Sequence, residues 1–183
     1  MLLRMAIKPR ILLQDEKFEV TLKRLCHQLI EVHNDFSQSV IIGLQPRGIY
    51  LARRIQEELK SILKKKNLPC GELDITFFRD DFRRKGLTPN KTNIDFIIED
   101  KNVILVDDVL YTGRTIRAGL DALLAFGRPK DVELLVLVDR RFQRHVPIQA
   151  KYIGISIDSI ASQNVKVEWL ESDGTDKVTL LNK

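Results

Sequence analysis

The chain has 183 residues, long enough for one domain with a single core. Its composition, 44% hydrophobic and 30% charged, excludes a disordered chain, and no apolar run approaches the roughly 18 residues of a membrane helix. The net charge of +5 suits an anionic partner, although on charge alone solvated surface lysines and arginines are the preferred explanation. Two cysteines without metal-like spacing and an N-terminus unlike a signal peptide predict a cytoplasmic protein. We therefore expect a single domain over residues 1–183, with no membrane association.

The first half of the chain alternates helical and strand patterns. Apolar residues at helical spacing predict a helix over 15–33, with Asp15 as its N-cap, and a second helix over 49–64. Between them, the apolar run 40–44 predicts a buried strand, and the Pro- and Gly-containing segment 45–48 predicts a turn.

The second half continues this alternation. Residues 72–78 alternate as a strand does, whereas 79–93 is charged and poor in apolar residues, which predicts a flexible loop or a partly ordered hairpin. Apolar strands are predicted at 103–106 and 132–138, with a helix over 115–126 between them. Shorter strand candidates follow at 151–157, 165–169 and 177–181. The fold class is therefore α/β, a mostly parallel sheet covered on both faces by helices, with a small irregular C-terminal part.

Residues 103–115, Val-Ile-Leu-Val-Asp-Asp-Val-Leu-Tyr-Thr-Gly-Arg-Thr, carry the strongest chemical signal. An apolar strand leads to the carboxylates Asp107 and Asp108, and the loop that follows opens a helix, where the amides of 111–115 form an anion site. Gly113 permits the tight turn that this loop requires. Paired carboxylates beside a phosphate cradle suit ribose hydroxyls and a Mg²⁺ ion that neutralises pyrophosphate.

This segment differs from two other phosphate-binding motifs. A Walker loop requires Gly-Lys-Ser/Thr before the helix, and no such sequence occurs here. The glycine-rich fingerprint of dinucleotide-binding folds is also missing.

The pattern 103–115 resembles the phosphoribosyl pyrophosphate (PRPP) signature of type I phosphoribosyltransferases. The resemblance extends to the PyrR proteins, which regulate pyrimidine operons by binding RNA and have uracil phosphoribosyltransferase activity. It is carried, in order within 14–157, by residues 47–52, 71–76, 79–81, 107–115, 118–123 and 136–140. It implies the type I phosphoribosyltransferase fold, with a small hood and a flexible loop, and a homodimer or higher oligomer.

The resemblance also implies roles for individual residues. It implies that pyrophosphate is bound by Arg47 and Gly48. It implies that the 5′-phosphate and ribose of PRPP are bound by Asp107, Asp108, Tyr111, Thr112, Gly113, Arg114 and Thr115. The base is expected to be bound by Val138, Asp139 and Arg140, partly through their backbone groups. The alternative for Arg140 is a surface cation at a strand end. Arg79, Asp80 and Asp81 belong to the loop that folds over the site.

The implied reaction joins uracil N1 to C1 of PRPP, giving UMP and pyrophosphate through an oxocarbenium-like transition state. Asp107 and Asp108 are the catalytic candidates, because their negative charge stabilises the ribose cation. Mg²⁺ is the expected cofactor, carried with PRPP and without dedicated protein ligands.

In PyrR proteins a basic surface binds the operon mRNA under control of UMP or UTP. The candidates here are Arg24, His27, Arg141 and Arg144. Val32, Gln149 and Ile155 stand where the family usually has basic residues, and such losses weaken RNA affinity. Three hypotheses follow: an enzyme acting on uracil, an RNA-binding regulator that keeps the site as a nucleotide sensor, and a phosphoribosyltransferase for another base.

Overall fold

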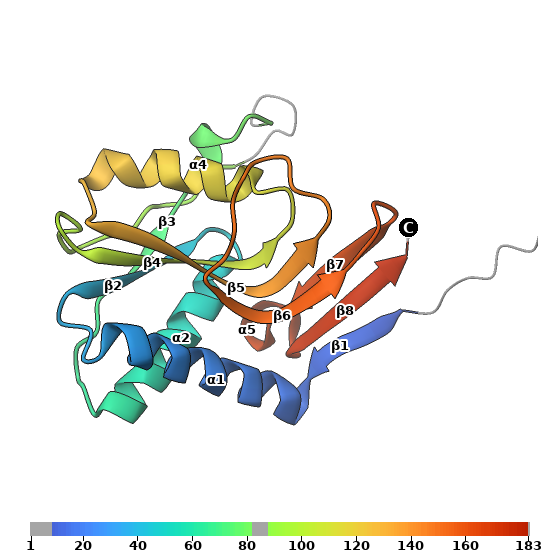
Figure 1. The fold of residues 1–183 in the computed structure, drawn as a ribbon, viewed down its shortest axis with the longest axis horizontal. Coiled ribbons are helices and arrows are strands. Elements are labelled where there is room, and N and C mark those ends of the chain that lie inside the picture. The colour runs from blue at the N-terminus through green and yellow to red at the C-terminus, as the bar shows by residue number, and fades with distance from the viewer. Residues whose placement is uncertain (1–8, 82–87, 183) are drawn as a thin grey trace, which may run out of the picture.

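A computed structural model describes residues 9–81 and 88–182 (Figure 1). Its centre is a five-stranded sheet in which every neighbouring pair is parallel. In spatial order the strands are β3 (Cys70–Leu73), β2 (Ser39–Leu44), β4 (Asn102–Leu110), β5 (Asp131–Arg141) and β6 (Tyr152–Asp158).

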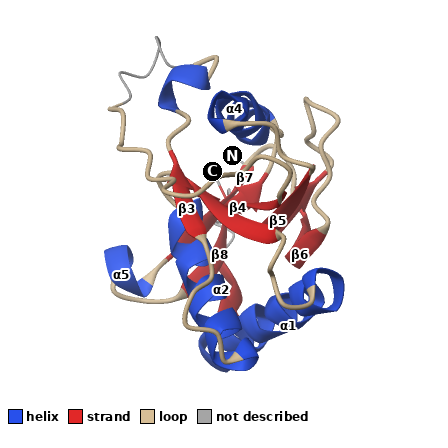
Figure 2. Ribbon diagram, turned by 90° about the vertical axis from the view of Figure 1, so that its left-hand side faces the viewer, coloured by secondary structure: helices blue, strands red, loops and turns tan. Residues whose placement is uncertain are grey.

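Helices cover both faces of this sheet, as predicted. Figure 2 shows α4 (Arg114–Leu123) above the sheet, with α1 (Asp15–His33) and α2 (Gly48–Leu63) below it. Each face has its own apolar core, and this double burial explains why β2, β4 and β5 contain almost continuous apolar runs. Within the described ranges, every helix is too short or too polar to cross a bilayer.

A second sheet contains the two strands predicted at 165–169 and 177–181 and one N-terminal strand that the sequence did not indicate (Figure 1). This hood is antiparallel, in the order β1 (Arg10–Gln14), β8 (Lys177–Asn182) and β7 (Gln163–Glu168), with α5 (Leu170–Asp173) between β7 and β8. The C-terminal part thus contains the predicted strands and forms the expected hood, but it is a regular sheet rather than an irregular segment. Its order depends on β1 from the far end of the chain, a pairing that no local pattern indicates.

Fully buried Trp169 fastens the hood to the main body. Its ring meets that of Phe18 on α1 edge-on, with 5.6 Å between ring centroids. The guanidinium of Arg54 on α2 lies 5.2 Å from the Trp169 ring centroid. Aromatic and cation–π contacts therefore join the hood to both helices of the lower face.

Two local predictions also need correction. The strand expected over 72–78 ends at Leu73, because its partner strand ends opposite it at Leu44, and the chain then forms a 3-10 turn over Thr76–Phe78. Helix α1 has Gln14 rather than Asp15 as its N-cap, and Asp15 already lies within the helix. Of the expected loop 79–93, residues 82–87 lie outside the described part of the chain.

Candidate active site

Strand β4 ends in the carboxylate pair, at the carboxyl edge of the parallel sheet where such folds bind ligands. Asp107 is 7% exposed, and its Oδ1 accepts a hydrogen bond of 2.9 Å from the Asp108 amide. Helix α2 begins directly against this point: a Cβ on Gly48 would lie 2.5 Å from the Val106 carbonyl oxygen and 3.0 Å from the Asp107 Cα. Gly48 is therefore required for the close contact between the turn and β4.

Burial makes the carboxylate pair electrostatically unfavourable by itself. It raises the pKa of Asp107 well above its ordinary value, and the negative charge of Asp108 adds to this. Burial also raises the pKa of Asp108, against the opposing effect of the Arg47 guanidinium. A cation or a ribose hydroxyl placed beside the pair would offset this cost. The oxygen donors suit Mg²⁺, although the described residues contain no cluster of three or more metal-ligating side chains.

The loop after β4 forms a phosphate-sized cradle. Gly113 adopts the left-handed conformation at φ 85° and is the N-cap of α4, where the amides of the first turn lack partners within the helix. One of them, the Arg114 amide, donates to Thr112 Oγ1 at 3.4 Å. The Thr112 carbonyl accepts hydrogen bonds from the amides of His145, at 2.9 Å, and Val146, at 3.2 Å, which fixes the loop from behind. A cavity of about 300 Å³ is lined by Arg79, Asp80, Asp81, Tyr111, Thr112, Arg114 and Thr115.

The described start of the expected flexible loop lies on the rim of this cavity. Arg79 makes a two-pronged ion pair with Asp81, at 2.8 and 2.9 Å. Asp80 pairs with the guanidinium of Arg114, 2.5 Å away, on the phosphate cradle itself. A negative charge thus occupies the edge of an anion site.

Arg47 lies on the opposite side of the carboxylate pair. Its Nε is 3.4 Å from Asp108 Oδ2, and its Nη2 donates to the Val167 carbonyl and, at 2.9 Å, to Asp173. A second cavity, of about 400 Å³, is lined by Arg47, Asp108, Val109, Val165, Lys166 and Val167. Asp108 therefore borders the cavity under the hood, while the first cavity is lined by the phosphate loop that follows the carboxylates in the chain.

The end of β5 forms the third wall. Arg140 is 4% exposed, so the alternative of a surface cation is wrong. Its guanidinium stacks 3.7 Å from the Tyr111 ring centroid and donates to Ser159 Oγ at 2.9 Å and the Gln163 carbonyl at 2.6 Å. Burial lowers the pKa of this guanidinium. Of the other base candidates, Val138 is fully buried and Asp139 pairs with Arg144.

Comparison with known proteins agrees with this geometry. A model of the phosphoribosyl transferase domain matches residues 11–172. The chain belongs to the phosphoribosyltransferase family. A "Bifunctional protein PyrR" of Desulfosudis oleivorans is 45% identical over 170 residues, 92% of this chain and 93% of that protein. One from Elusimicrobium minutum is 44% identical over 176 residues, 95% of this chain and 97% of that protein, so the chain falls within the PyrR group of the family.

Solved phosphoribosyltransferases share the fold at lower sequence identity. A hypoxanthine phosphoribosyltransferase of Staphylococcus aureus superimposes with a TM-score of 0.68 at 20% identity, covering 95% of this chain and 92% of that one. That of Trypanosoma cruzi gives a TM-score of 0.70 at 16% identity, covering 94% and 96%. These likenesses confirm the predicted fold.

The four RNA-binding candidates lie in two different settings. Arg24 and His27 are exposed on α1, and Arg24 Nη2 donates to the carbonyls of Ile153, at 3.1 Å, and Gly154 on β6. Arg141 is exposed in an ion pair with Asp158. Arg144 instead lies in the wall of the site, where it donates to Asp139 and to the carbonyls of Tyr111, Arg140 and Ile148.

Sequence reasoning missed the hood side of the site. Val165, Lys166 and Val167 line the second cavity, and Asp173 holds Arg47. Nothing in their local sequence indicates such a position, because β7 is placed by its pairing with β8 and by contacts with residues distant in the chain.

Proposed function

We propose that the protein transfers the phosphoribosyl group of PRPP to uracil, giving UMP and pyrophosphate. The observation that carries the proposal is the carboxylate pair near the end of β4, where Asp108 lines the arginine-bearing cavity and the phosphate loop follows directly in the chain. The relatives named "Bifunctional protein PyrR" support uracil as the base. We propose the cytoplasm as the location because the chain has only two cysteines and both are free.

Different residues of the chain would bind the phosphate, ribose and pyrophosphate parts of PRPP. The amides of 111–115 and the hydroxyls of Thr112 and Thr115 would bind the 5′-phosphate at the start of α4. Asp107 and Asp108 would accept hydrogen bonds from the ribose hydroxyls, and Arg47 would bind pyrophosphate. Mg²⁺ carried with PRPP would neutralise the leaving group beside the two carboxylates.

In the reaction, the bond from C1 of the ribose to pyrophosphate breaks as N1 of uracil bonds to C1, and the proton of N1 leaves with the pyrophosphate. Positive charge develops on the ribose, and the carboxylate pair stabilises it in a buried, low-dielectric position. Backbone groups of Val138, Asp139 and Arg140 would orient the base. The guanidinium of Arg140 already stacks on Tyr111 and donates to Ser159 and Gln163. Its contribution to base binding would therefore come from its backbone. Movement of Arg79, Asp80 and Asp81 over the site would exclude water.

We further propose that a homodimer or higher oligomer of the chain binds pyrimidine operon mRNA in response to UMP or UTP. The exposed cations Arg24 and Arg141, together with His27, are the best candidates for the RNA contact. Arg144 ranks below them, because its guanidinium already contacts four acceptor groups inside the protein.

Pyrophosphate release from PRPP and Mg²⁺ tests the enzyme, with uracil, hypoxanthine, guanine, adenine and orotate in parallel. We expect turnover with uracil alone. Turnover only with another base would refute uracil specificity, and no turnover with any base would favour the nucleotide-sensing regulator.

Two paired variants test the separation of functions. Asp107→Asn with Asp108→Asn should abolish turnover and leave RNA affinity unchanged, whereas Arg24→Ala with His27→Ala should do the converse. Loss of both properties in either variant would contradict two separate sites.

A further inference from the structure

The hood contacts the candidate pyrophosphate arginine through one short turn. Helix α5 follows Trp169, and its Asp173 accepts a hydrogen bond of 2.9 Å from Arg47 Nη2. The same oxygen, Oδ2, accepts hydrogen bonds from the Trp169 amide at 2.9 Å and from Ser172 Oγ at 2.8 Å. Asp173 is therefore held by its own turn, independently of Arg47, and provides a fixed anchor.

The Arg47 guanidinium is held from two sides. The core carboxylate of Asp108 lies 3.4 Å from Nε, while Asp173 and the Val167 carbonyl accept from Nη2. Nη1 has no hydrogen-bond partner among residues 9–81 and 88–182. Since a guanidinium binds anions through pairs of N–H groups in a rigid plane, fixing two of its nitrogens sets the direction of the third.

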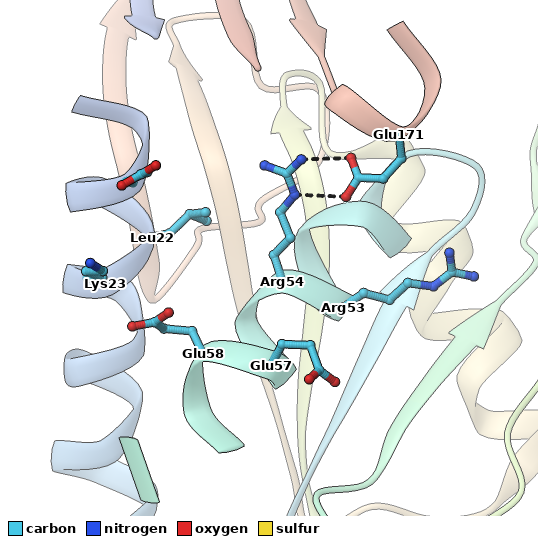
Figure 3. A pocket seen from close by; sticks show the side chains of 8 residues that line it. Leu22, Lys23, Arg53, Arg54, Glu57, Glu58 and Glu171 are labelled. Carbon is cyan, nitrogen blue, oxygen red and sulfur yellow. Dashed lines mark hydrogen bonds and ion pairs between the residues drawn. The ribbon is translucent and has the colours of Figure 1, made fainter. Parts of the chain in front are cut away.

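A second arginine shows that the turn can be anchored without contact to the site. Arg54, two helical turns after Arg47, makes paired hydrogen bonds with Glu171 at 3.0 and 2.8 Å (Figure 3) and another with Asp176 at 2.8 Å. This pair borders a cavity of about 530 Å³ between α1 and α2, which shares no lining residue with the two cavities of the site. Asp176 also accepts a hydrogen bond of 2.8 Å from the Leu170 amide, so like Asp173 it joins a backbone amide of this turn to an arginine, but that arginine is Arg54 and not Arg47.

We propose that Asp173 is a positioning residue that orients the Arg47 guanidinium, leaving Nη1 directed at the pyrophosphate of PRPP. The inference rests on the proposed function. It makes the hood part of the pyrophosphate site, because the orientation of Arg47 then depends on where α5 sits.

Steady-state kinetics of Asp173→Asn, with Asp176→Asn as the matched control, test this role. We expect Asp173→Asn to raise the KM for PRPP about fivefold by weakening a charge-assisted hydrogen bond, with kcat and the KM for uracil within about twofold. Asp176→Asn should lower the melting temperature and leave the KM for PRPP unchanged. Equal KM increases in both variants would overturn the proposal, because they would indicate general loosening of the hood.

A double-mutant cycle separates positioning from structural damage. In an Arg47→Ala background, Asp173→Asn should change the KM for PRPP by less than about twofold. The same fivefold cost in that background would overturn the proposal.

Calorimetric measurement of PRPP binding separates failure of the proposed reaction from failure of the proposed role of Asp173. If the wild type binds PRPP but turns over no base, the proposed reaction fails, and an approximately fivefold weaker affinity of Asp173→Asn would still support positioning. Equal affinities would overturn positioning, and no PRPP binding by the wild type would overturn both.

Discussion

The Gly48→Ala substitution tests whether the contact between α2 and β4 sets the geometry of the site. The added methyl would lie 2.5 Å from the Val106 carbonyl oxygen, 3.0 Å from the Asp107 Cα and 3.3 Å from Asp107 Oδ1. The two nearest atoms belong to the backbone of a central strand, so a side-chain rotation cannot relieve the overlap. The start of α2 must therefore move away from β4.

The size of this movement follows from the contact distance. To reach ordinary contact at 3.4 Å from the carbonyl oxygen, the two segments must separate by about 1 Å. Overpacking of this kind costs about 1–3 kcal/mol in the free energy of unfolding. Because Arg47 precedes Gly48 and the carboxylates follow Val106, the same shift alters their relative positions. A misplacement of about 1 Å lowers kcat/KM roughly a hundredfold.

The assay combines urea unfolding with pyrophosphate release, using Gly119→Ala as the control. Gly119 also lies on a helix packed against the sheet, but its Cβ would meet only Leu side chains, at 3.0 Å and beyond, which can rotate. In the control we expect unchanged turnover and a free energy of unfolding within about 1 kcal/mol of the wild type, since helix propensity offsets the crowding. A Gly48→Ala variant with wild-type stability and turnover within twofold would refute the reasoning.

Three further predictions concern buried groups. Asp107→Asn should lower kcat by about a hundredfold or more. It should also raise the free energy of unfolding at pH 7, because burial raises the pKa of Asp107 and penalises its ionised form. A loss of stability in urea unfolding would contradict this. The stability of the wild type should fall as the pH drops below about 6.5, because burial lowers the pKa of His33 and the unfolded chain takes up the proton first. His33→Gln should flatten that part of the pH profile, and an unchanged slope between pH 6.5 and 5.5 would refute the assignment. Trp169→Ala should cost about 3–5 kcal/mol in chemical denaturation by removing the contact between hood and body, and a cost under about 1 kcal/mol would show that the hood is held elsewhere.

The local sequence predicted the parts of the fold in which neighbouring residues share an environment. The buried strands at 40–44, 103–106 and 132–138 and the helices between them were recognisable, because burial on both faces requires continuous apolar runs. The PRPP motif was recognisable for the same reason, since its strand, carboxylates and glycine turn lie within thirteen residues.

Partners distant in the chain set the remaining features. β1 becomes a strand only by pairing with β8, and the strand predicted over 72–78 stops where β2 ends. From the sequence, Arg140 was a base-binding candidate or a surface cation, and Arg144 was an RNA-binding candidate. In the structure the first stacks on Tyr111 and the second donates to four acceptor groups. The sequence by itself determined the parallel core and the phosphate loop, because contiguous residues form them. Only the tertiary structure decided that Asp173 would meet Arg47, 126 positions away, because the energy of such a pair depends on a distance in space that no local pattern encodes.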